Sequence, residues 1–164
     1  MYKKKGGSQP RKDTPKCSPM YSCYHDEVAT AVAAQIAATP DFNSADTDKG
    51  IRNEYSTYVM GTFRCYNPNC STQLWGSGKV TILIRKYQGG SYNAVVFMQR
   101  CEGCNRLGKL KMDMTSYVER VTYRLLKWAG VAPEPPSYGA KKTPPHEAHL
   151  CEGCKRGVCR APGV

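Results

Sequence analysis

The spacing of seven cysteines and one histidine constrains the fold of this chain more than any other feature. Cys65 and Cys70 enclose four residues, and Cys101 and Cys104 enclose two. A cluster near the C-terminus adds His146, Cys151, Cys154 and Cys159. A C-x2-C pair places two thiolates on one tight turn, from which both can reach a single ion at about 2.3 Å. These eight residues complete two tetrahedral sites, so we expect two structural zinc ions.

The spacing of the eight ligands does not by itself determine which four bind each ion. Sequential grouping, which we favour, assigns both cysteine pairs to one ion and the C-terminal cluster to the other. Interleaved grouping is the alternative, because ribbon folds often pair knuckles that are distant in sequence. His149 could also replace His146. With four protein ligands each, neither ion keeps an open position for a substrate, which indicates structural rather than catalytic zinc.

The remaining cysteines bear on the cellular compartment. Nine cysteines is an odd number, which argues against a fully paired disulfide framework. The basic N-terminus lacks the apolar segment of a secretory signal, and no apolar run approaches the length of a membrane span. We therefore expect a reducing compartment, the cytoplasm or alternatively the nucleus. Cys17, Cys23 and His25 offer only three ligands, so we expect free thiols and a surface imidazole there.

Two segments have helical periodicity. Residues 26–39 carry an apolar side chain at every fourth position and are followed by a proline. Residues 116–129 are the stronger candidate, and Gly130 is a natural stop. Ser116 and Glu119 match the capping box, in which each side chain satisfies a free backbone N–H. The predicted buried stripe of this helix is Val118, Val121, Leu125 and Trp128.

Between the helical segments the period changes to that of β-strands. Residues 55–64 are rich in Thr, Tyr, Val and Phe and lead into the first cysteine pair. Residues 79–86 alternate, and residues 92–100 return after a Gly-Gly turn and end at the second pair. In the middle strand, one predicted face carries Val80, Ile82 and Ile84, and the other carries Thr81, Leu83 and Arg85.

These patterns together predict an α+β fold: a zinc-ribbon-like domain with a small antiparallel sheet, two zinc knuckle clusters and two helices. Residues 1–16 are rich in Lys, Gly, Ser and Pro, which predicts a disordered basic arm. Residues 17–164 are predicted to form a single domain, in which a Pro-rich loop over residues 133–145 brings the last ligands to their site.

The charge balance favours a polyanionic partner. Lys and Arg total 24 against 13 for Asp and Glu, a formal net charge of +11. Nucleic acid is the commonest partner of such a surface, since cations hold phosphates while aromatic faces stack unpaired bases. The alternative is a solvated basic surface without a specific partner. The candidate RNA-binding cations are Arg85, Lys86, Arg100, Arg106, Lys109, Lys111, Arg120, Arg124 and Lys127. The tyrosines interleaved with them are Tyr87, Tyr92, Tyr117 and Tyr123.

The residues by themselves reveal no catalytic machinery. The chain has no Ser-His-Asp order, no Walker loop and no Rossmann glycine pattern, so we expect no nucleotide cofactor.

Most of the chain resembles the 3CxxC-type zinc-finger family, and its fungal members in particular. The resemblance runs from about residue 24 to residue 159 and is carried by GTFRCYNPNC, LWGSGKVTI, YNAVVFMQRCEGC, SYVERVTYRLLKW and PHEAHLCEGCKRGVC. His25 and Asp26 match the fungal helix start, although Tyr24 replaces the usual Leu. The first knuckle is C-x4-C here, as in many fungal members. The family pattern favours His146 over His149 as the eighth ligand.

The resemblance implies three functions. Some small fungal members resemble arginine-containing cyclodipeptide synthases, which condense arginyl-tRNA with a second aminoacyl-tRNA into a diketopiperazine. A stand-alone, strongly basic domain fits that group best, so an aminoacyl-tRNA-dependent transferase is the leading expectation. A non-catalytic RNA-binding regulator, as among the oocyte relatives, is the alternative. A receptor-trafficking chaperone is the third, less favoured because the sequence ends shortly after Cys159 without an anchor segment.

The implied reaction suggests roles for particular residues. An aminoacyl ester is already activated, so holding two tRNA 3′ ends together supplies much of the catalysis. An acid must bind the arginine guanidinium, and a base must deprotonate the attacking amine. The candidates are Glu119 or Asp26 for the arginine, and His25 or Tyr92 for proton transfer or orientation. The second amino acid and the oligomeric state are beyond the sequence.

Overall fold

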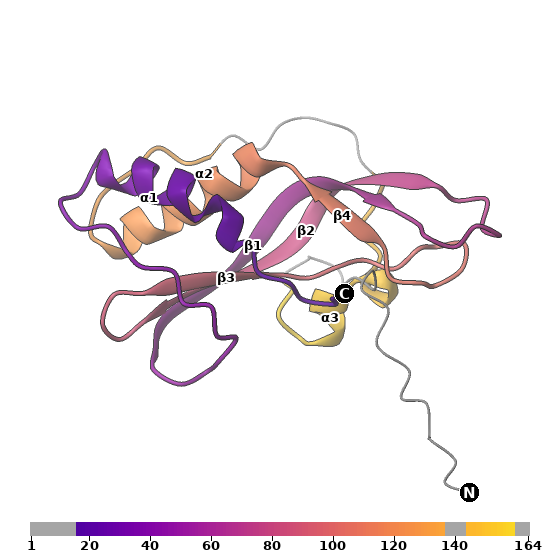
Figure 1. Ribbon diagram of the computed structural model, residues 1–164, viewed down its shortest axis with the longest axis horizontal. Helices are drawn as coiled ribbons and strands as arrows, with labels where there is room; N and C mark the ends of the chain where they lie inside the picture. Colours follow the sequence, from indigo (N-terminus) through magenta and orange to yellow (C-terminus); the bar gives the residue numbers. More distant parts are fainter. Residues whose placement is uncertain (1–15, 137–143, 160–164) are drawn as a thin grey trace, which may run out of the picture.

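A four-stranded antiparallel sheet forms the centre of the computed structural model, which describes residues 16–136 and 144–159. Its strands are β1 (Ile51–Arg64), β2 (Leu74–Tyr87), β3 (Tyr92–Val96) and β4 (Lys109–Met112), in the order β3-β2-β1-β4. β1 and β2 form a long hairpin whose turn extends well beyond the helices (Figure 1). The α+β class with a small antiparallel sheet is confirmed.

The predicted N-terminal arm falls almost wholly outside the described residues, which begin at Lys16. The arm and the domain boundary after residue 16 therefore stay predictions. The segment that follows covers the β3 edge of the sheet, because Val96 N–H donates to Pro19 O and Met98 N–H donates to Cys17 O, both at 2.9 Å. An edge strand covered in this way is protected from pairing with another chain.

Helices lie on both sides of the sheet. Helix α1 (His25–Ala33), which follows the 3-10 turn Ser22–Tyr24, and helix α2 (Met114–Trp128) pack together on one face (Figure 1). The 3-10 turn Ala148–Leu150 and the short helix α3 (Glu152–Lys155) lie on the other side. No helix within the described residues is long and apolar enough to cross a bilayer.

Helix α1 ends at Ala33, earlier than the predicted residue 39. Val28 and Val32 are buried in the main core, but among residues 33–39 only Ile36 packs against it. One partly buried side chain gives the last turns little tertiary support, and short helices depend on such packing.

Strand β2 is buried on both of its faces. Val80, Ile82 and Ile84 join the main core together with residues of both helices. On the opposite face Leu83 packs with Val95 and Phe97. The predicted alternation of side chains between the two faces of β2 is thus confirmed. Other parts of the protein cover both faces, which agrees with the few polar side chains on this strand.

Arg85 is the exception on that second face, and its predicted role as an RNA-binding cation is wrong. Its side chain is 1% exposed, and Nη1 lies 2.6 Å from an Asp46 carboxylate oxygen. Asp48 and Glu54 complete the ion-pair set at 3.8 Å and 3.7 Å. A buried charge requires such partners. Asp46 and Asp48 tie the acidic segment before β1 to the sheet, whereas Glu54 lies within β1, where it pairs with Arg85.

Helix α2 begins two residues before the predicted start, and the predicted capping box is wrong. The N-cap is Asp113, whose carboxylate accepts from the Ser116 N–H at 3.0 Å. The Ser116 hydroxyl accepts from the Met60 N–H of β1 at 3.0 Å, which joins helix to sheet. The buried stripe contains Tyr117, Val121, Leu125 and Leu126, with Val118 and Trp128 only partly buried. Gly130, at φ +83°, follows the helix as predicted.

We predict that Asp113→Ala lowers the free energy of unfolding of the zinc-loaded protein by about 1 kcal/mol, the usual effect of losing an N-cap. Asp113→Asn should retain most of that stability, because an amide oxygen also caps. The control is Glu119→Ala, which removes the side chain that the capping box requires and should cost less than Asp113→Ala, because Asp113 is the N-cap and Glu119 is exposed. Urea unfolding followed by circular dichroism measures all three. A larger loss for Glu119→Ala than for Asp113→Ala would restore the capping box.

Candidate metal centres and basic surface

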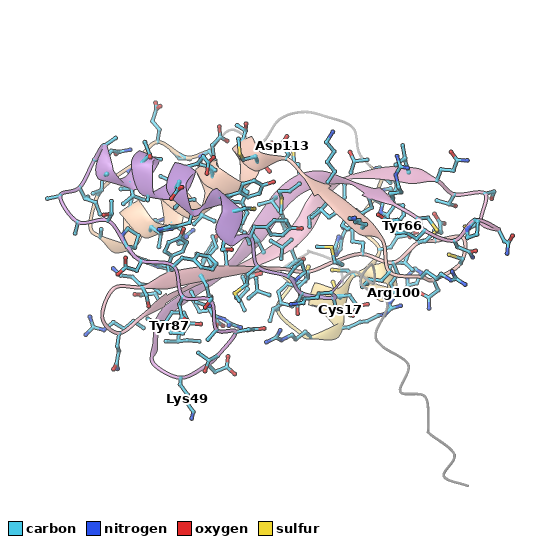
Figure 2. All side chains as sticks on the ribbon, viewed as in Figure 1. Cys17, Lys49, Tyr66, Tyr87, Arg100 and Asp113 are labelled. Carbon is cyan, nitrogen blue, oxygen red and sulfur yellow. The ribbon has the colours of Figure 1, made fainter. Side chains whose placement is uncertain are left out.

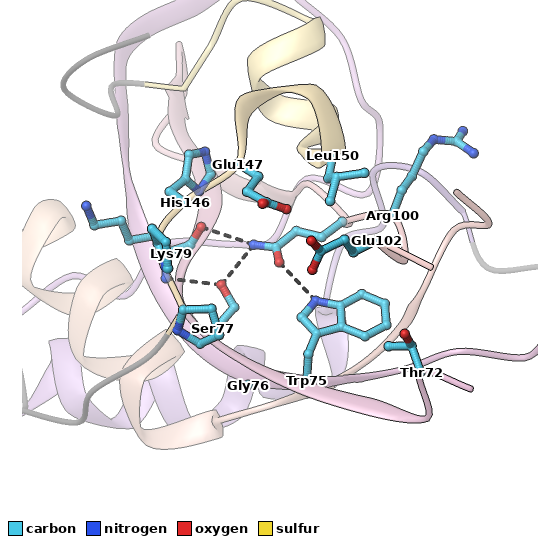
Figure 3. Close-up of a pocket in the computed structure, with 13 residues that line it drawn as sticks. Thr72, Trp75, Gly76, Ser77, Lys79, Arg100, Glu102, His146, Glu147 and Leu150 are labelled. Carbon is cyan, nitrogen blue, oxygen red and sulfur yellow. Dashed lines mark hydrogen bonds between the residues drawn. The ribbon is translucent and has the colours of Figure 1, made fainter. Parts of the chain in front are cut away.

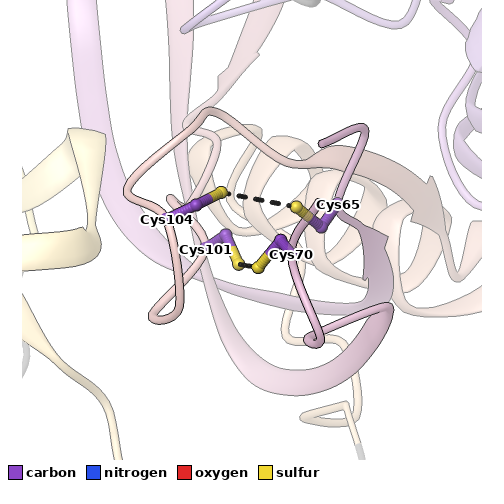
Figure 4. Close-up of side chains that lie close together, drawn as sticks. All are labelled: Cys65, Cys70, Cys101 and Cys104. Carbon is purple, nitrogen blue, oxygen red and sulfur yellow. Dashed lines mark hydrogen bonds between the residues drawn. The ribbon is translucent and has the colours of Figure 1, made fainter. Parts of the chain in front are cut away.

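The first metal centre lies at the turn end of the long hairpin (Figure 4). Cys65 directly follows β1, Cys70 lies in the turn, and Cys101 and Cys104 come from the segment between β3 and β4. The four ligand atoms all lie within 4.8 Å of one another. The Cys65–Cys104 and Cys70–Cys101 sulfur pairs are 3.6 Å and 3.7 Å apart. Tetrahedral zinc with Zn–S bonds of about 2.3 Å requires sulfurs about 3.8 Å apart, whereas a disulfide requires about 2.05 Å.

Local backbone structure directs these thiols inward. The Cys70 N–H donates to Asn67 O at 3.1 Å, which closes the first knuckle. The Asn105 N–H donates to Cys101 O at 2.7 Å, which closes the second. Gly103 allows the two knuckles to meet, because a Cβ there would lie 2.9 Å from the Cys70 sulfur. Glycine is used at such close approaches.

The second metal centre comes entirely from the C-terminal segment. His146, Cys151, Cys154 and Cys159 place their ligand atoms within 4.8 Å of one another. His146 Nε2 lies 3.3 Å from the Cys154 sulfur and 3.6 Å from the Cys159 sulfur. The sequential grouping of ligands is therefore confirmed, as is the choice of His146 over His149.

The second centre is attached to the sheet through Thr81 of β2. The Thr81 hydroxyl donates to the Cys159 sulfur at 3.2 Å. A Cβ on Gly153 would lie 2.9 Å from Thr81, so only glycine fits there. Backbone hydrogen bonds join Arg100 N–H to Leu150 O at 2.7 Å and Glu152 N–H to Met98 O at 3.0 Å. Hydrogen bonds to a metal-bound thiolate orient it and tune its charge.

The thiol chemistry of the first centre also fits a metal. A hydrogen bond from the Arg106 backbone N–H lowers the pKa of Cys104 to about 7, whereas burial raises the pKa of Cys65 to about 12. Four thiolates held this close repel one another, so their ionisation requires a compensating cation. Four cysteines, or three cysteines with one histidine, are the ligand sets of structural zinc sites. The two sets thus support two structural zinc ions.

Cys17, Cys23 and His25 were expected to be free thiols and a surface imidazole, and the two thiols are as expected, but His25 is half-buried. Among the described residues, Cys17 and Cys23 are exposed thiols outside both ligand sets. His25 instead contacts Tyr92, with 2.9 Å between Nδ1 and the phenol oxygen.

The four predicted catalytic residues are only partly assembled. His25 and Tyr92 form the contact just described, but Tyr92 is 0% exposed, and burial raises the pKa of its phenol. Asp26 and Glu119 are exposed on the two helices, and Glu119 lies 3.5 Å from Arg120. None of the better-formed cavities in the described part of the chain is lined by any of the four.

The predicted RNA-binding cations fall into three groups by exposure. Arg106, Lys109, Lys111 and Lys127 are exposed, Lys86, Arg100 and Arg124 are half-buried, and Arg85 and Arg120 are buried. Arg120, at 3% exposed, cannot face a polyanion from the surface, so that prediction is wrong, as for Arg85. Arg124 lies over the Tyr55 ring at 3.3 Å from its centre. Arg100 is bound to Glu152 at 2.7 Å.

Two of the exposed cations belong to a surface that the sequence did not predict. We call it the distal face, and it consists of Thr62, Arg64, Tyr66, Leu74, Lys109, Leu110 and Lys111, which line one shallow groove. Arg64 is paired with Leu74 on one side and with Lys109 on the other. Tyr66 and Leu74 are 46% and 56% exposed, unusually much for large apolar side chains. The sequence signal for β4 is the alternation of polar and apolar residues in Lys-Leu-Lys-Met. Four residues are too few for such an alternation to predict a strand.

We predict that the purified protein binds two zinc ions per chain and that His146→Ala weakens only the second centre. Three thiolates then remain there, so a chelator should remove that zinc at a lower concentration, while the first centre keeps its metal. The matched control is His149→Ala, which should bind both ions as tightly as the unaltered protein. Elemental analysis during a chelator titration measures both. Equal zinc loss from the two variants would contradict the ligand assignment.

Residues 58–157 match the family model of the 3CxxC zinc-ribbon type, which is described as a zinc-binding domain and here covers more than half of the chain. The matched span contains every ligand except Cys159. No curated protein and no solved structure matches the chain. With two zinc-type ligand sets inside the matched fold, this chain belongs to the 3CxxC zinc-ribbon family.

Proposed function

We propose that this protein binds single-stranded RNA on its distal face, with both zinc ions in structural roles. The observation that carries the proposal is the composition of the groove on that face. Arg64, Lys109 and Lys111 line it together with exposed Tyr66, and none of its lining residues is acidic. Cations hold the phosphates of a single strand, while an aromatic face stacks an unpaired base.

Strand pairing explains why these side chains share one face. Lys109 and Lys111 alternate along β4 and so point to the same side of the sheet. The register places Lys109 beside Arg64, and Lys111 beside Thr62. The Lys109 ammonium lies 5.6 Å from the centre of the Tyr66 ring, so charge and aromatic surface are adjacent. A sheet face of this kind suits a flexible strand whose bases are accessible.

The first zinc centre supports this face directly. Arg64 precedes the ligand Cys65, and Tyr66 follows it. Coordination of Cys65 therefore fixes the backbone that presents both side chains. Loss of the metal should loosen the face before it affects the helix-covered half of the sheet.

We predict that the double variant Lys109→Gln, Lys111→Gln binds a single-stranded RNA at least tenfold more weakly. It should also show a shallower dependence of log affinity on log salt, by about 0.7 for each phosphate that is no longer neutralised. Fluorescence anisotropy between low and physiological salt measures both quantities.

The control for this experiment is Lys49→Gln. Lys49 is exposed, and Figure 2 shows it at the opposite end of the molecule from Tyr66. This variant should bind almost as tightly as the unaltered protein. An equal effect of Lys49→Gln would mean that net charge, rather than the distal face, drives binding. Tyr66→Ala should weaken binding without changing the salt dependence, because stacking involves no counterion release.

The contact between His25 and Tyr92 supports a second candidate function, aminoacyl-tRNA-dependent cyclodipeptide synthesis, which the resemblance implies for some small fungal members of this family. In that proposal His25, which is half-buried, is the proton-transfer group, and Tyr92 orients its ring from within the core. Asp26 and Glu119 are exposed and accessible to the arginyl group of a charged tRNA. A bound tRNA would have to bring these helix positions into one site.

For this second candidate, we expect that the zinc-loaded protein incubated with charged tRNAs forms an arginine-containing diketopiperazine, detected by mass spectrometry. His25→Gln should abolish the product, because an amide cannot act as a base, while leaving RNA affinity unchanged. Glu119→Gln should reduce it by weakening the hold on the guanidinium. RNA binding without any product would leave the non-catalytic regulator as the function.

The proposal includes a reducing compartment, the cytoplasm or the nucleus. All nine cysteines are free of disulfide bonds in the structure. Eight zinc ligands that include seven thiolates require such a setting to remain metal-bound.

A further inference from the structure

A cavity of about 320 Å³ is lined by residues close to both metal centres, and Figure 3 shows these lining residues. His146, a ligand of the second centre, forms part of its wall. Thr72 forms part of the opposite wall and is close to the first centre, since a Cβ on Gly103 would touch both the Thr72 hydroxyl and the Cys70 sulfur. Its size is at the lower end of the range for small-molecule sites, roughly 300–1,000 Å³.

One wall of the cavity is rigid and aromatic. The Trp75 indole N–H donates to the Gln99 side-chain oxygen at 3.2 Å, and the Gln99 amide donates to the Ser77 hydroxyl at 2.8 Å. Phe63 stacks on the indole with ring centres 5.2 Å apart. Gly108 approaches the ring edge so closely that a Cβ there would lie 2.5 Å from it. The indole is therefore held in place before any ligand arrives.

The charged groups that point into the cavity are negative. The carboxylates of Glu102 and Glu147 point toward its middle, whereas the charged ends of Lys79 and Arg100 point out of it (Figure 3). Arg100 is neutralised by Glu152 at 2.7 Å. Among the described residues neither Glu102 nor Glu147 has an ion-pair partner. With zinc bound, the four-thiolate centre and the centre of three thiolates and one imidazole carry formal charges of about −2 and −1.

We propose that this cavity binds an organic cation, the guanidinium or primary ammonium group of an amino-acid-sized ligand. Two carboxylates accept charge-assisted hydrogen bonds from such a group, and an indole adds attraction to a cation. An anion would meet the carboxylates and both metal–thiolate groups. The site is separate from the distal face, because Trp75 points to the opposite side of β2 from its neighbour Leu74.

Isothermal titration of the zinc-loaded protein with N-acetyl-arginine amide, N-acetyl-lysine amide and N-acetyl-citrulline amide tests this proposal. Citrulline has nearly the same shape as arginine but carries no charge. At least one cation should bind ten or more times more tightly than the citrulline compound, and the preferred one identifies guanidinium or ammonium as the ligand group. The indole N–H resonance of Trp75, assigned with Trp128→Phe, should shift during the same titration.

The double variant Glu102→Gln, Glu147→Gln should lose at least tenfold in affinity for the preferred cation while it still binds two zinc ions. The control is Glu134→Gln, an exposed acid outside the cavity lining, which should bind unchanged. Equal binding of the citrulline compound, undiminished affinity in the zinc-loaded double variant, or no binding of either cation would each overturn the proposal. Lys109→Gln, Lys111→Gln should leave cation binding intact, so this result is independent of RNA binding.

Discussion

Zinc coordination by two sets of clustered thiols is the interaction on which the rest of this structure depends. Sulfurs 3.6–3.7 Å apart repel one another as thiolates, and only a bound cation makes their proximity favourable. The first centre joins both strands of the long hairpin to the segment before β4. The second joins the C-terminal segment to the sheet through Thr81. Each zinc can contribute on the order of 10 kcal/mol to folding.

The two centres also separate surfaces of opposite charge. The basic distal face lies on one side of the hairpin, beside the first centre, and the cavity with its two inward carboxylates is lined by residues close to both centres. Strand β2 contributes to both, since Leu74 and Trp75 point to opposite sides of it. On these two proposals, a polyanion and a small organic cation would bind one small domain without competing for the same side chains.

Periodicity in the sequence predicted those elements whose pattern depends on neighbouring residues. It failed for those features that depend on contacts between residues far apart in the sequence. The alternation along β2 was predicted because side chains of a strand point alternately to its two faces. The start of α2 was not predicted correctly, because Asp113 and Ser116 are both residue types that cap helices well. In the structure Asp113 caps the helix, and the Ser116 hydroxyl instead accepts a hydrogen bond from the Met60 N–H of β1. Strand β4 has four residues, and its existence depends on pairing with β1. The early end of α1 likewise reflects missing tertiary support.

The sequence by itself determined which seven cysteines bind zinc, because ligand chemistry and turn spacing are local properties. The tertiary structure alone decided how those ligands group into two sets and which cations reach the surface. Arg85 has the same charge as Lys109, yet three carboxylates surround the first while the second faces solvent. That difference arises from strand register and chain crossings, which bring together residues far apart in the sequence.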